Sequence, residues 1–502
     1  MARFILIAIC AVALSAQSLQ KLRTFYSSDA AEVPAALASG KKSAVASDGI
    51  EWAAASRGLV RNSKEYFAGK RYLPDDEVLA LAPDSARGMW VRTRTGVSHI
   101  ELREMTLEQK AAAFEQRIAK RHDRYGMVAD SHLAKAGDLA SNVLESSDND
   151  GLWTAMYAAA ECFRYAVTKD PNALAAAHHA IEAVLFLEDV TGVAGLPARS
   201  YVKKDDPRPK DGAWHWTADK QIQWKGDTSS DEIVGHFFIL SIAYDLLDDP
   251  ALKARLATAA RRMMDHIISH GYDLIDVTGK PTTWGKWSPE YFATNGKYDS
   301  ALNALELLSF LKTTEHMTGD PKYAAEYKKA AVDRKYAQQA ARYLELRYEI
   351  NYSDEELAML SFYPFFRYEN SALMRSALDQ WWENCQREKN PLWIYIYGVG
   401  HPDQKVDAAG ALSTLERIPM DLITWKVVNS DRKDVVMEKD LDRAHEKQAR
   451  TLLPPDERPV MKWNGNPFVV DGGDGGYSED DGAFFLLPYW MGRFLGVVPA
   501  SR

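Results

Sequence analysis

Residues 233–268 read IVGHFFILSIAYDLLDDPALKARLATAARRMMDHII and contain two helical patterns of different kinds. The first half, 233–247, is apolar on almost every side. In the second half, the apolar residues Leu252, Leu256, Met263 and Ile267 form one stripe, with lysine and arginine beside it. A helix that is apolar all round must be buried, whereas a striped helix keeps a face in water. The stretch therefore predicts an inner helix followed by an outer one.

The turn between these helices recurs along the chain. Asp170-Pro171, Asp249-Pro250 and Asp320-Pro321 each combine a capping aspartate with a proline suited to the first helical turn. The pattern predicts inner helices at 150–167, 231–247 and 300–318, outer helices at 172–188 and 251–270, and further inner helices at 353–366, 407–417 and 480–495. Thr106-Leu-Glu-Gln109 opens an earlier charged helix that runs to about Arg121, and we interpret it as one residue out of register for a capping box.

With its alternating buried and striped helices, the region from about 125 to 497 resembles the (α/α)6-toroid superfamily of glycoside hydrolases and polysaccharide lyases. The resemblance is one of architecture, and no motif selects a family within it. It implies a mainly α fold, with a toroid of inner and outer helices over 106–502 and a small β-rich region before it. An α-solenoid is the structural alternative, although a 34-residue repeat typical of that class is absent.

The N-terminus has the composition of a secretory signal. Met1-Ala2-Arg3 is followed by the apolar run 4–14 and by small residues at 15 and 16. We therefore expect 1–16 to be a cleaved signal peptide and the protein to be secreted or periplasmic. Residues 17–45 are rich in Ala, Ser and Lys, and we expect them to form an exposed, flexible leader.

A weak repeat follows in residues 46–105. Trp52 and Gly58 align with Trp90 and Gly96, and each pair brackets a strand-like run. The sequence predicts short antiparallel strands near 50–62 and 89–102. The segment from Leu73 to Gly96 also resembles one blade of a two-component-regulator-type propeller, although a closed propeller needs at least about four blades. The alternative is a small hairpin region without propeller ancestry.

Composition excludes several partners. The net charge is −9, so there is no basic footprint for nucleic acid. No later apolar run is long enough to span a membrane, and we expect no membrane anchor. After the signal, Cys162 and Cys385 remain. Both lie in apolar helical patterns, which favours buried thiols, although a single bridge between them stays open.

Two long loops are candidates for contact with a ligand, since long ordered loops are usually functional. Their aromatic side chains suit the apolar faces of sugar rings, and the alternative is that they bury the loops. The substrate-binding residues we predict are Asp148 and Asp227, then Arg199, Trp214, His215 and Trp216 from 190–228, and Trp284, Trp287, Tyr291 and Asn295 from 271–298.

Acidic residues recur where the inner helices begin, at Asp148 and Asp150, Asp227 and Asp231, Asp299, Asp354, and Asp480 and Asp481. Hydrolysis of a glycosidic bond needs one protonated and one ionised carboxyl, and we predict Asp150 and Asp231 as that pair. The alternative is that these acids cap helices. Because a helix N-terminus favours the ionised form, the acid needs burial or a like-charged neighbour to raise its pKa.

Histidine offers a different chemistry, elimination from a uronate. His215, His236 or His401 with Tyr291 or Tyr298 would serve as base, and Arg199, Lys203 or Asn295 would neutralise the carboxylate. We include His236 among the catalytic candidates, although its apolar surroundings also suit a core histidine.

We expect no metal and no cofactor. His266 and His270 have the spacing of a metal pair, but they suit the end of an outer helix better. The Gly- and Asp-rich loop 471–482 suits turns and caps better than calcium.

The sequence thus predicts an enzyme that hydrolyses glycosidic bonds of a poly- or oligosaccharide. The alternatives are a lyase acting on a uronate-containing glycan and a non-enzymatic oligosaccharide-binding or sensing protein.

Overall fold

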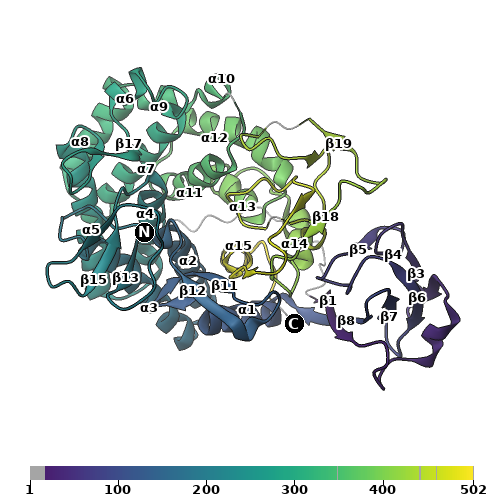
Figure 1. The fold of residues 1–502 in the computed structure, drawn as a ribbon. Helices are drawn as coiled ribbons and strands as arrows, with labels where there is room; N and C mark the ends of the chain where they lie inside the picture. The colour runs from purple at the N-terminus through teal and green to yellow at the C-terminus, as the bar shows by residue number, and fades with distance from the viewer. Residues whose placement is uncertain (1–16, 348, 440–441, 460, 501–502) are drawn as a thin grey trace.

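The computed structural model describes residues 17–347, 349–439, 442–459 and 461–500. The predicted signal peptide, 1–16, lies outside the described residues. The chain forms a β-rich N-terminal module and a larger helical body, which lie side by side (Figure 1). Within the described residues, no helix combines the length and apolarity that crossing a membrane requires.

The N-terminal module consists of two antiparallel sheets with the strand orders β1-β8-β7-β6 and β2-β3-β4-β5. Trp52 and Phe67 from one sheet pack against Met89 and Ile100 from the other, so a common core fills the space between the sheets. The elements are β1 (Gln17–Tyr26), η1 (Ala35–Ser39), β2 (Ser43–Val45), β3 (Glu51–Ala54), β4 (Leu59–Arg61), β5 (Glu65–Phe67), β6 (Val78–Pro83), β7 (Met89–Thr93) and β8 (Val97–Thr106).

The start of this module differs from the flexible leader predicted for 17–45. Strand β1 pairs with β8 from Gln17 opposite Thr106 to Tyr26 opposite Val97. Two charged side chains of β1 also bind residues far along the chain. Lys21 forms an ion pair with Asp456 at 2.6 Å, and Arg23 forms one with Asp421 at 3.0 Å. A strand held by backbone pairing and long-range ion pairs needs no apolar run, which is why its composition resembled a leader.

The strands predicted near 50–62 and 89–102 are confirmed as β3–β4 and β7–β8. The two tryptophans of the repeat have different environments, however. Trp52 is fully buried between the sheets. Trp90 lies in another cluster and stacks on His99, with ring centroids 4.2 Å apart. The resemblance to a propeller blade is not confirmed.

The helical body has six helices that contact one another in succession, α15 returning to α2. Figure 1 shows them around the centre of the body. They are α2 (Asp150–Thr168), α4 (Ser230–Leu246), α7 (Ser300–Thr318), α11 (Tyr352–Tyr368), α13 (Pro391–Gly400) and α15 (Ala483–Phe494).

Other helices alternate with these along the chain and pack on their outer sides. They are α1 (Leu107–Arg121), α3 (Pro171–Asp189), α5 (Pro250–Ser269), α8 (Pro321–Lys328), α12 (Ala372–Cys385) and α14 (Ala408–Arg417). The shorter helices are α6 (Pro289–Ala293), α9 (Tyr336–Ala340), α10 (Tyr343–Leu346), η2 (Leu139–Ser141), η3 (Lys329–Asp333), η4 (Gln386–Glu388) and η5 (Pro455–Glu457).

Burial confirms the predicted contrast between inner and outer helices. In α4, an unbroken run from Glu232 to Ala243 is buried, whereas the buried residues of α5 follow the predicted stripe. The fifth inner helix was predicted wrongly at 407–417. It is α13, whose sequence PLWIYIYGVG is apolar on all sides but too short to stand out, while α14 is buried at Ala411, Leu412 and Leu415.

The helix starts follow the expected capping chemistry, with one correction. Asp170, Asp249 and Asp320 each accept a hydrogen bond from a backbone N–H in the first turn, and each is followed by proline. Thr106 and Gln109 form a complete capping box, so our interpretation that this motif was out of register was wrong. Gln109 is the third residue of the helix, which is the position that a capping box requires.

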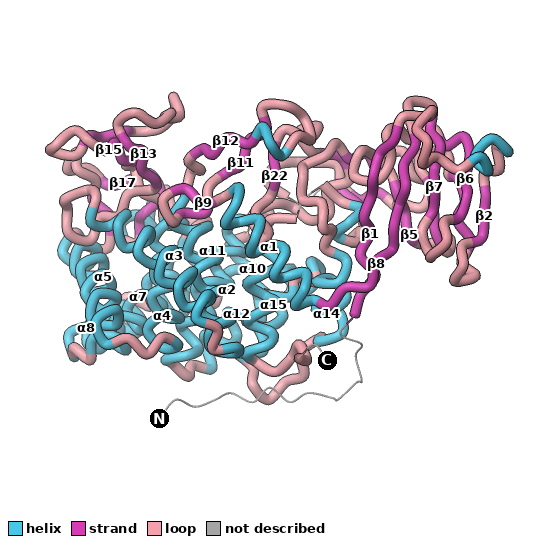
Figure 2. The backbone as a smooth tube through the Cα atoms, turned by 90° about the horizontal axis from the view of Figure 1, so that it is seen from below, coloured by secondary structure: helices cyan, strands magenta, loops and turns pink. Residues whose placement is uncertain are grey.

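The remaining strands lie together on one side of the helices (Figure 2). They are β9 (Asp123–Arg124), β10 (Met127–Val128), β11 (Asp130–Leu133), β12 (Asn142–Glu145), β13 (Ser200–Lys203), β14 (Trp214–Trp216), β15 (Ile222–Lys225), β16 (Asp273–Ile275), β17 (Pro281–Lys286), β18 (Val427–Val428), β19 (Met437–Glu438), β20 (Gln448–Ala449), β21 (Asp471–Gly472) and β22 (Ser478–Glu479). Cys162 and Cys385 are free, buried thiols, as favoured above.

Candidate functional site

An open cleft of about 530 Å³ lies where several inner helices begin. Its walls come from the first turns of α2, α4, α7 and α11 and from loops between distant parts of the chain. The lining residues are Asp130, Ser147, Asp148, Asn149, Trp153, Arg199, Ser230, Asp231, Trp284, Tyr291, Asp299, Leu302, Asn303, Asn351, Ser353, Asp354, Leu357, Arg443, Lys462 and Asn464.

Three carboxyls reach the cleft from the starts of three inner helices. Asp231 lies in the first turn of α4, Asp299 is the N-cap residue of α7, and Asp354 lies in the first turn of α11. The free N–H groups of a helix start stabilise a carboxylate there. The succession of helices around the body thus brings together acids that are far apart in sequence.

Asp354 has the most perturbed environment of the three. Burial and the neighbouring carboxyls Asp299 and Asp231 together raise its pKa to about 7. The Asn351 side-chain amide donates a hydrogen bond to Asp354 Oδ1 at 2.8 Å, which offsets part of that rise. Asp354 is therefore protonated in a large fraction of molecules at neutral pH, unlike an ordinary aspartate.

Asp299 is held by a tyrosine. The Tyr291 hydroxyl donates a hydrogen bond to Asp299 Oδ2 at 2.6 Å. Burial and this carboxylate raise the pKa of Tyr291, so the phenol keeps its proton and remains a donor. The contact orients one carboxylate of the cleft.

Buried acids lie beneath the cleft. Glu356 is fully buried, neither carboxyl oxygen has a hydrogen-bond partner, and burial and Asp231 hold its pKa well above the usual range. Burial raises the pKa of Glu306 to about 8, while Trp287 Nε1 donates to its Oε2 at 2.7 Å. Glu306 is therefore mainly neutral at pH 7, and burial favours the neutral form of Glu356 as well.

Aromatic side chains stand on the cleft walls. Trp153 comes from α2, Trp284 from β17 and Tyr291 from α6. Trp284 is 49% exposed, and Lys462 Nζ lies 5.1 Å from the centroid of the Trp153 ring. An exposed indole face beside carboxylates suits a ligand that has both apolar faces and a polar rim, as a sugar ring does.

Among the described residues of the lining, five aspartates, one of them the partly protonated Asp354, stand against two arginines and one lysine. Some of the cations are already paired. Arg199 contacts Asp148 at 2.7 Å and also donates to the carbonyl of Asp227 at 3.2 Å. Lys462 lies 3.6 Å from Asp130. The cleft is therefore acidic, which favours neutral or cationic ligands over anionic ones.

The loops 190–228 and 271–298 meet at this cleft, as expected. Thr283 donates to Asp227 through its backbone N–H at 2.7 Å and its hydroxyl at 2.8 Å, which ties the loops directly. Of the residues singled out from the sequence, the cleft brings together Asp148, Arg199, Asp231, Trp284, Tyr291, Asp299 and Asp354.

Asp150 does not line the cleft. It is fully buried, and its carboxylate accepts hydrogen bonds from Arg124, Ser200 and Ser147. Burial raises its pKa, against the lowering effect of Arg124 and the serines. The first residue of α2 thus points toward β13, where it fastens three segments, and the pairing of Asp150 with Asp231 across one bond is not found.

His236 is a core histidine. It is buried in α4, its Nδ1 lies 2.8 Å from the carbonyl of Glu232, and burial lowers its pKa to about 4. His215 packs on Trp224, with ring centroids 4.6 Å apart, and His401 pairs with Asp379 at 2.9 Å. These three predicted bases are absent from the cleft lining.

The other predicted binding residues lie elsewhere. Trp214 and Trp216 belong to β14, beside the cleft lining but not part of it. Trp287 is fully buried, and Asn295 is exposed on the loop after α6. Some tryptophans of these loops therefore line the cleft, and others support the loops.

Several cleft residues were missed by the sequence analysis. Trp153 carried a usable signal, because it lies in the first turn of an inner helix, one turn from Asp150. Arg443, Lys462 and Asn464 come from the long segment between α14 and α15. No sequence pattern within that segment indicates that it covers the cleft.

The metal alternatives are accounted for by other contacts. His270 Nδ1 lies 2.7 Å from the carbonyl of His266, and His266 Nε2 lies 3.1 Å from that of Ile275. Asp471 accepts a hydrogen bond from the backbone N–H of Asn429, next to β18, and Asp474 accepts one from the backbone N–H of Gly476 in its own loop. Elsewhere in the described chain, Glu355, Cys385 and Glu388 have metal-ligand spacing but are buried, and burial raises the pKa of both carboxyls, which favours shared protons.

No protein-family model matches the chain, and no curated protein matches it. Among solved structures, it is similar to a thermostable endoglucanase from Alicyclobacillus acidocaldarius, with 12% identity, a TM-score of 0.40, and coverage of 82% of this chain and 92% of that chain. A sugar epimerase from a ruminal bacterium has 11% identity and a TM-score of 0.30, covering 77% and 97% respectively. A family 76 glycoside hydrolase (mannosidase) from Bacteroides thetaiotaomicron has 11% identity and a TM-score of 0.26, covering 56% and 86%. Similarity at this level does not transfer an activity to this chain.

Proposed function

We propose that the protein is a carbohydrate-active enzyme that hydrolyses a glycosidic bond in the cleft, with Asp354 as the general acid. The observation that carries this proposal is the raised pKa of Asp354 beside Asp231 and Asp299 in an aromatic-walled cleft. A pair of carboxyls with opposite protonation is the requirement of glycoside hydrolysis. Asp354 here takes the place of Asp150 in the predicted pair.

The roles follow from the environments. Protonated Asp354 gives its proton to the departing glycosidic oxygen as the bond from the anomeric carbon breaks. Asp231, at the start of α4, is the carboxylate that takes a proton from the attacking water or attacks the anomeric carbon itself. Asp299, oriented by Tyr291, lies beside them and stabilises positive charge that develops on the sugar.

We also propose that the helical body is an (α/α)6 toroid. The closed succession of contacts from α2 to α15 and back, with outer helices between them, supports this architecture. Alternating inner helices enter from one end, so their preceding loops cluster there. This arrangement accounts for a cleft lined by aspartates from distant parts of the sequence, namely Asp130, Asp148, Asp231, Asp299 and Asp354.

The uronate lyase is less well supported. The cleft is acidic, so the carboxylate of a uronate would meet like charges. The histidines that would serve as base lie elsewhere in the structure. An oligosaccharide-binding protein would use the same aromatic side chains, but binding alone does not require a protonated carboxyl group.

A panel of neutral, amino and acidic glycans, assayed for new reducing ends and for ultraviolet absorbance, tests the proposal. Hydrolysis produces reducing ends without absorbance, whereas elimination produces an unsaturated, absorbing uronide. Asp354→Asn should lower kcat about 10²–10⁴-fold, the usual contribution of a general acid. Asp205→Asn, an exposed loop substitution, is the matched control and should leave kcat unchanged. Absorbing products would establish the lyase, and binding without turnover would establish the binding protein.

We further propose that the protein is exported with residues 1–16 removed, because they carry a positive start, an apolar run and small residues before Gln17. Expression of the full chain in a bacterial host, followed by N-terminal sequencing of protein from the periplasm and the medium, tests this. Retention of Met1 in a cytoplasmic product would contradict it.

A further inference from the structure

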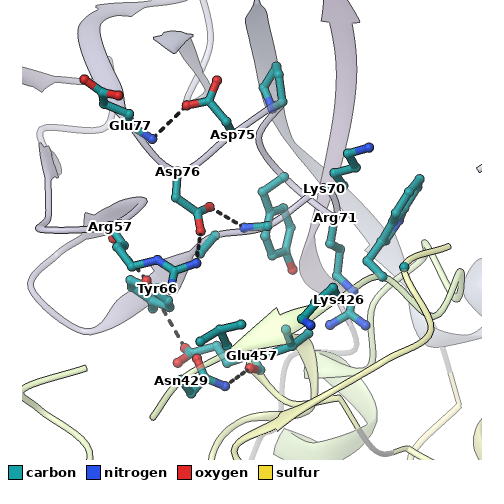
Figure 3. Close-up of a pocket in the computed structure, with 18 of the residues that line it drawn as sticks. Arg57, Tyr66, Lys70, Arg71, Asp75, Asp76, Glu77, Lys426, Asn429 and Glu457 are labelled. Carbon is teal, nitrogen blue, oxygen red and sulfur yellow. Dashed lines mark hydrogen bonds and ion pairs between the residues drawn. The ribbon is translucent and has the colours of Figure 1, made fainter. Parts of the chain in front are cut away.

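A second cavity, of about 580 Å³, lies at the junction of the N-terminal module and the helical body (Figure 3). One wall is the segment from Tyr66 to Glu77, between β5 and β6. The other is formed by 425–429, which includes β18, together with η5. None of its lining residues belongs to the acidic cleft, so the two sites are separate.

The carboxylates of this cavity are satisfied by the protein itself. Asp76 binds Arg57 at 2.9 Å and the backbone N–H of Gly69 at 2.7 Å. Glu77 pairs with Arg94 at 3.2 Å. Asp456 pairs with Lys21 and Arg417, and Glu457 with Arg417 and Arg432. Their negative charge is therefore largely balanced without a ligand.

Three cations of the cavity lack such partners. Arg71 is 3% exposed, its Nη1 donates to the carbonyl of Asp456 at 3.1 Å, and its buried Nε has no hydrogen-bond partner. The ammonium groups of Lys70 and Lys426 form no ion pair or hydrogen bond among the described residues. Arg71 lines the cavity and Lys70 and Lys426 are exposed beside it, so an anionic ligand would supply the acceptors that these cations lack.

The charges are arranged on two sides. Figure 3 shows Lys70, Arg71 and Lys426 on one side of the cavity and Asp75, Asp76 and Glu77 on the other. The first side suits an anionic group. The carboxylate oxygens on the second side each have more than one lone pair, so they can accept hydrogen bonds from hydroxyls in addition to those from Arg57, Gly69 and Arg94. The volume is far larger than a simple oxyanion requires and falls in the range of small-ligand sites.

We propose that this junction cavity binds a sugar that carries an anionic group, a carboxylate or a phosphate, with Lys70, Arg71 and Lys426 holding the anion. The site would hold an acidic saccharide away from the cleft, where the acidic lining disfavours one. Because it bridges module and body, a bound ligand would also stabilise their contact.

Calorimetric titration of the full chain at low ionic strength tests the proposal, with glucuronate, glucose 6-phosphate, glucose and inorganic phosphate as separate ligands. We expect the two anionic sugars to bind, glucose not to bind, and added salt to weaken the affinity. Binding of one anionic sugar without the other identifies which anion the site prefers. Equal binding of inorganic phosphate would overturn the assignment of a sugar site, and absence of binding by every anion would overturn the site altogether.

Variants locate the site. The double substitution Lys70→Ala and Lys426→Ala should weaken binding at least about tenfold, since it removes two charge-assisted hydrogen bonds to the anion. Both lysines are exposed, so folding should be retained. Lys64→Ala, an exposed lysine of the same module outside the cavity, is the control and should bind normally. Unchanged binding by the double variant would contradict the proposal. Asp354→Asn should also bind normally, which separates this test from that of the hydrolytic site.

Discussion

Asp150 and Asp354 occupy similar places at the starts of two inner helices, but their surroundings differ. Asp150 lies against Arg124 and two serines and acts as a structural anchor. Asp354 accepts a hydrogen bond from the neutral amide of Asn351 and faces Asp299 and Asp231. Like-charged neighbours and burial favour the protonated form, whereas a buried cation favours the ionised one. Burial raises the pKa of both aspartates, so what separates them is position: Asp354 lines the cleft, whereas Asp150 is enclosed by Arg124 and the serines.

The proposed role of Asp354 as general acid, together with its pKa of about 7, predicts a pH dependence. A general acid is active when protonated, so kcat/KM on an identified substrate should fall as pH rises through about 7. A pH profile of kcat/KM measures this. A rate that continues to rise above that pH would show that Asp354 acts as a base instead.

The same pKa predicts an effect on stability. Because the folded pKa of Asp354 lies above its ordinary value, the folded protein binds the extra proton, and the wild type loses stability as pH rises from about 4 to about 7. Asp354→Asn avoids that loss. It should raise the free energy of unfolding by about 1–3 kcal/mol near pH 8, allowing for water in the cleft, and change it little near pH 4. Urea unfolding at the two pH values measures the difference, and an effect of equal size at both would exclude titration as its cause.

At the scale of elements, α2 and α4 pack closely near the helix starts that border the cleft. A Cβ at Gly235 would lie 2.6 Å from the Cα of Leu152, and one at Gly151 would lie 2.0 Å from Glu232 Oε2. The absence of a side chain at Gly151 lets its N–H donate to Glu232 Oε1 at 3.0 Å. These contacts set the distance between the helix starts that carry Trp153 and Asp231.

Gly235→Ala should therefore be destabilising, although alanine is the better helix former. The new methyl group meets backbone, which cannot move aside as a side chain can, and overpacking of this kind costs about 1–3 kcal/mol. Thermal unfolding of the variant measures the cost. An unchanged or higher Tm would show that α2 and α4 lie further apart than described.

At the scale of the whole molecule, the N-terminal module is joined to the body by buried charges. Lys21 on β1 pairs with Glu65 within the module and with Asp456 of the body, which also pairs with Arg417. Burial acts to raise the pKa of Asp456, but Lys21 and Arg417 outweigh it, and the pKa lies below its ordinary value. The ionised Asp456 thus stabilises the junction.

Lys21→Met retains the apolar stem and removes the charge. It should lower the free energy of unfolding by about 1–3 kcal/mol at neutral pH, less than for a fully unpaired buried charge because Arg417 remains. Because the folded pKa of Asp456 is lowered, its contribution to stability is present above its ordinary pKa and is lost as pH falls. The stability difference between wild type and Lys21→Met should therefore narrow below about pH 4. Denaturant unfolding measures both effects. Lys64→Met, at an exposed site, is the control and should change stability little.

Local patterns were enough to predict much of the framework. The all-round apolarity of 233–247, the stripe of 252–267 and the Asp-Pro corners are properties of neighbouring residues, and each predicted its helix and its layer. The strands near Trp52 and Trp90 were predicted in the same way. The same patterns did not predict β1, because this strand is held by pairing with β8 and by ion pairs with Asp421 and Asp456.

The sequence predicted which part of the molecule forms the candidate site, and the tertiary structure determined which residues line it. The recurrence of acids at inner helix starts predicted a mouth with several carboxyls, and Asp231, Asp299 and Asp354 lie there. Successive residues of a helix point about 100° apart, so one position decides whether a first-turn aspartate faces the cleft or a neighbouring strand. Arg124 held Asp150 inward, while burial together with Asp299 and Asp231 raised the pKa of Asp354, which lines the cleft. These partners are remote in sequence, and pKa depends on surroundings in space, so the sequence alone determined where the acids gather and only the fold determined which of them reaches the cleft with a raised pKa.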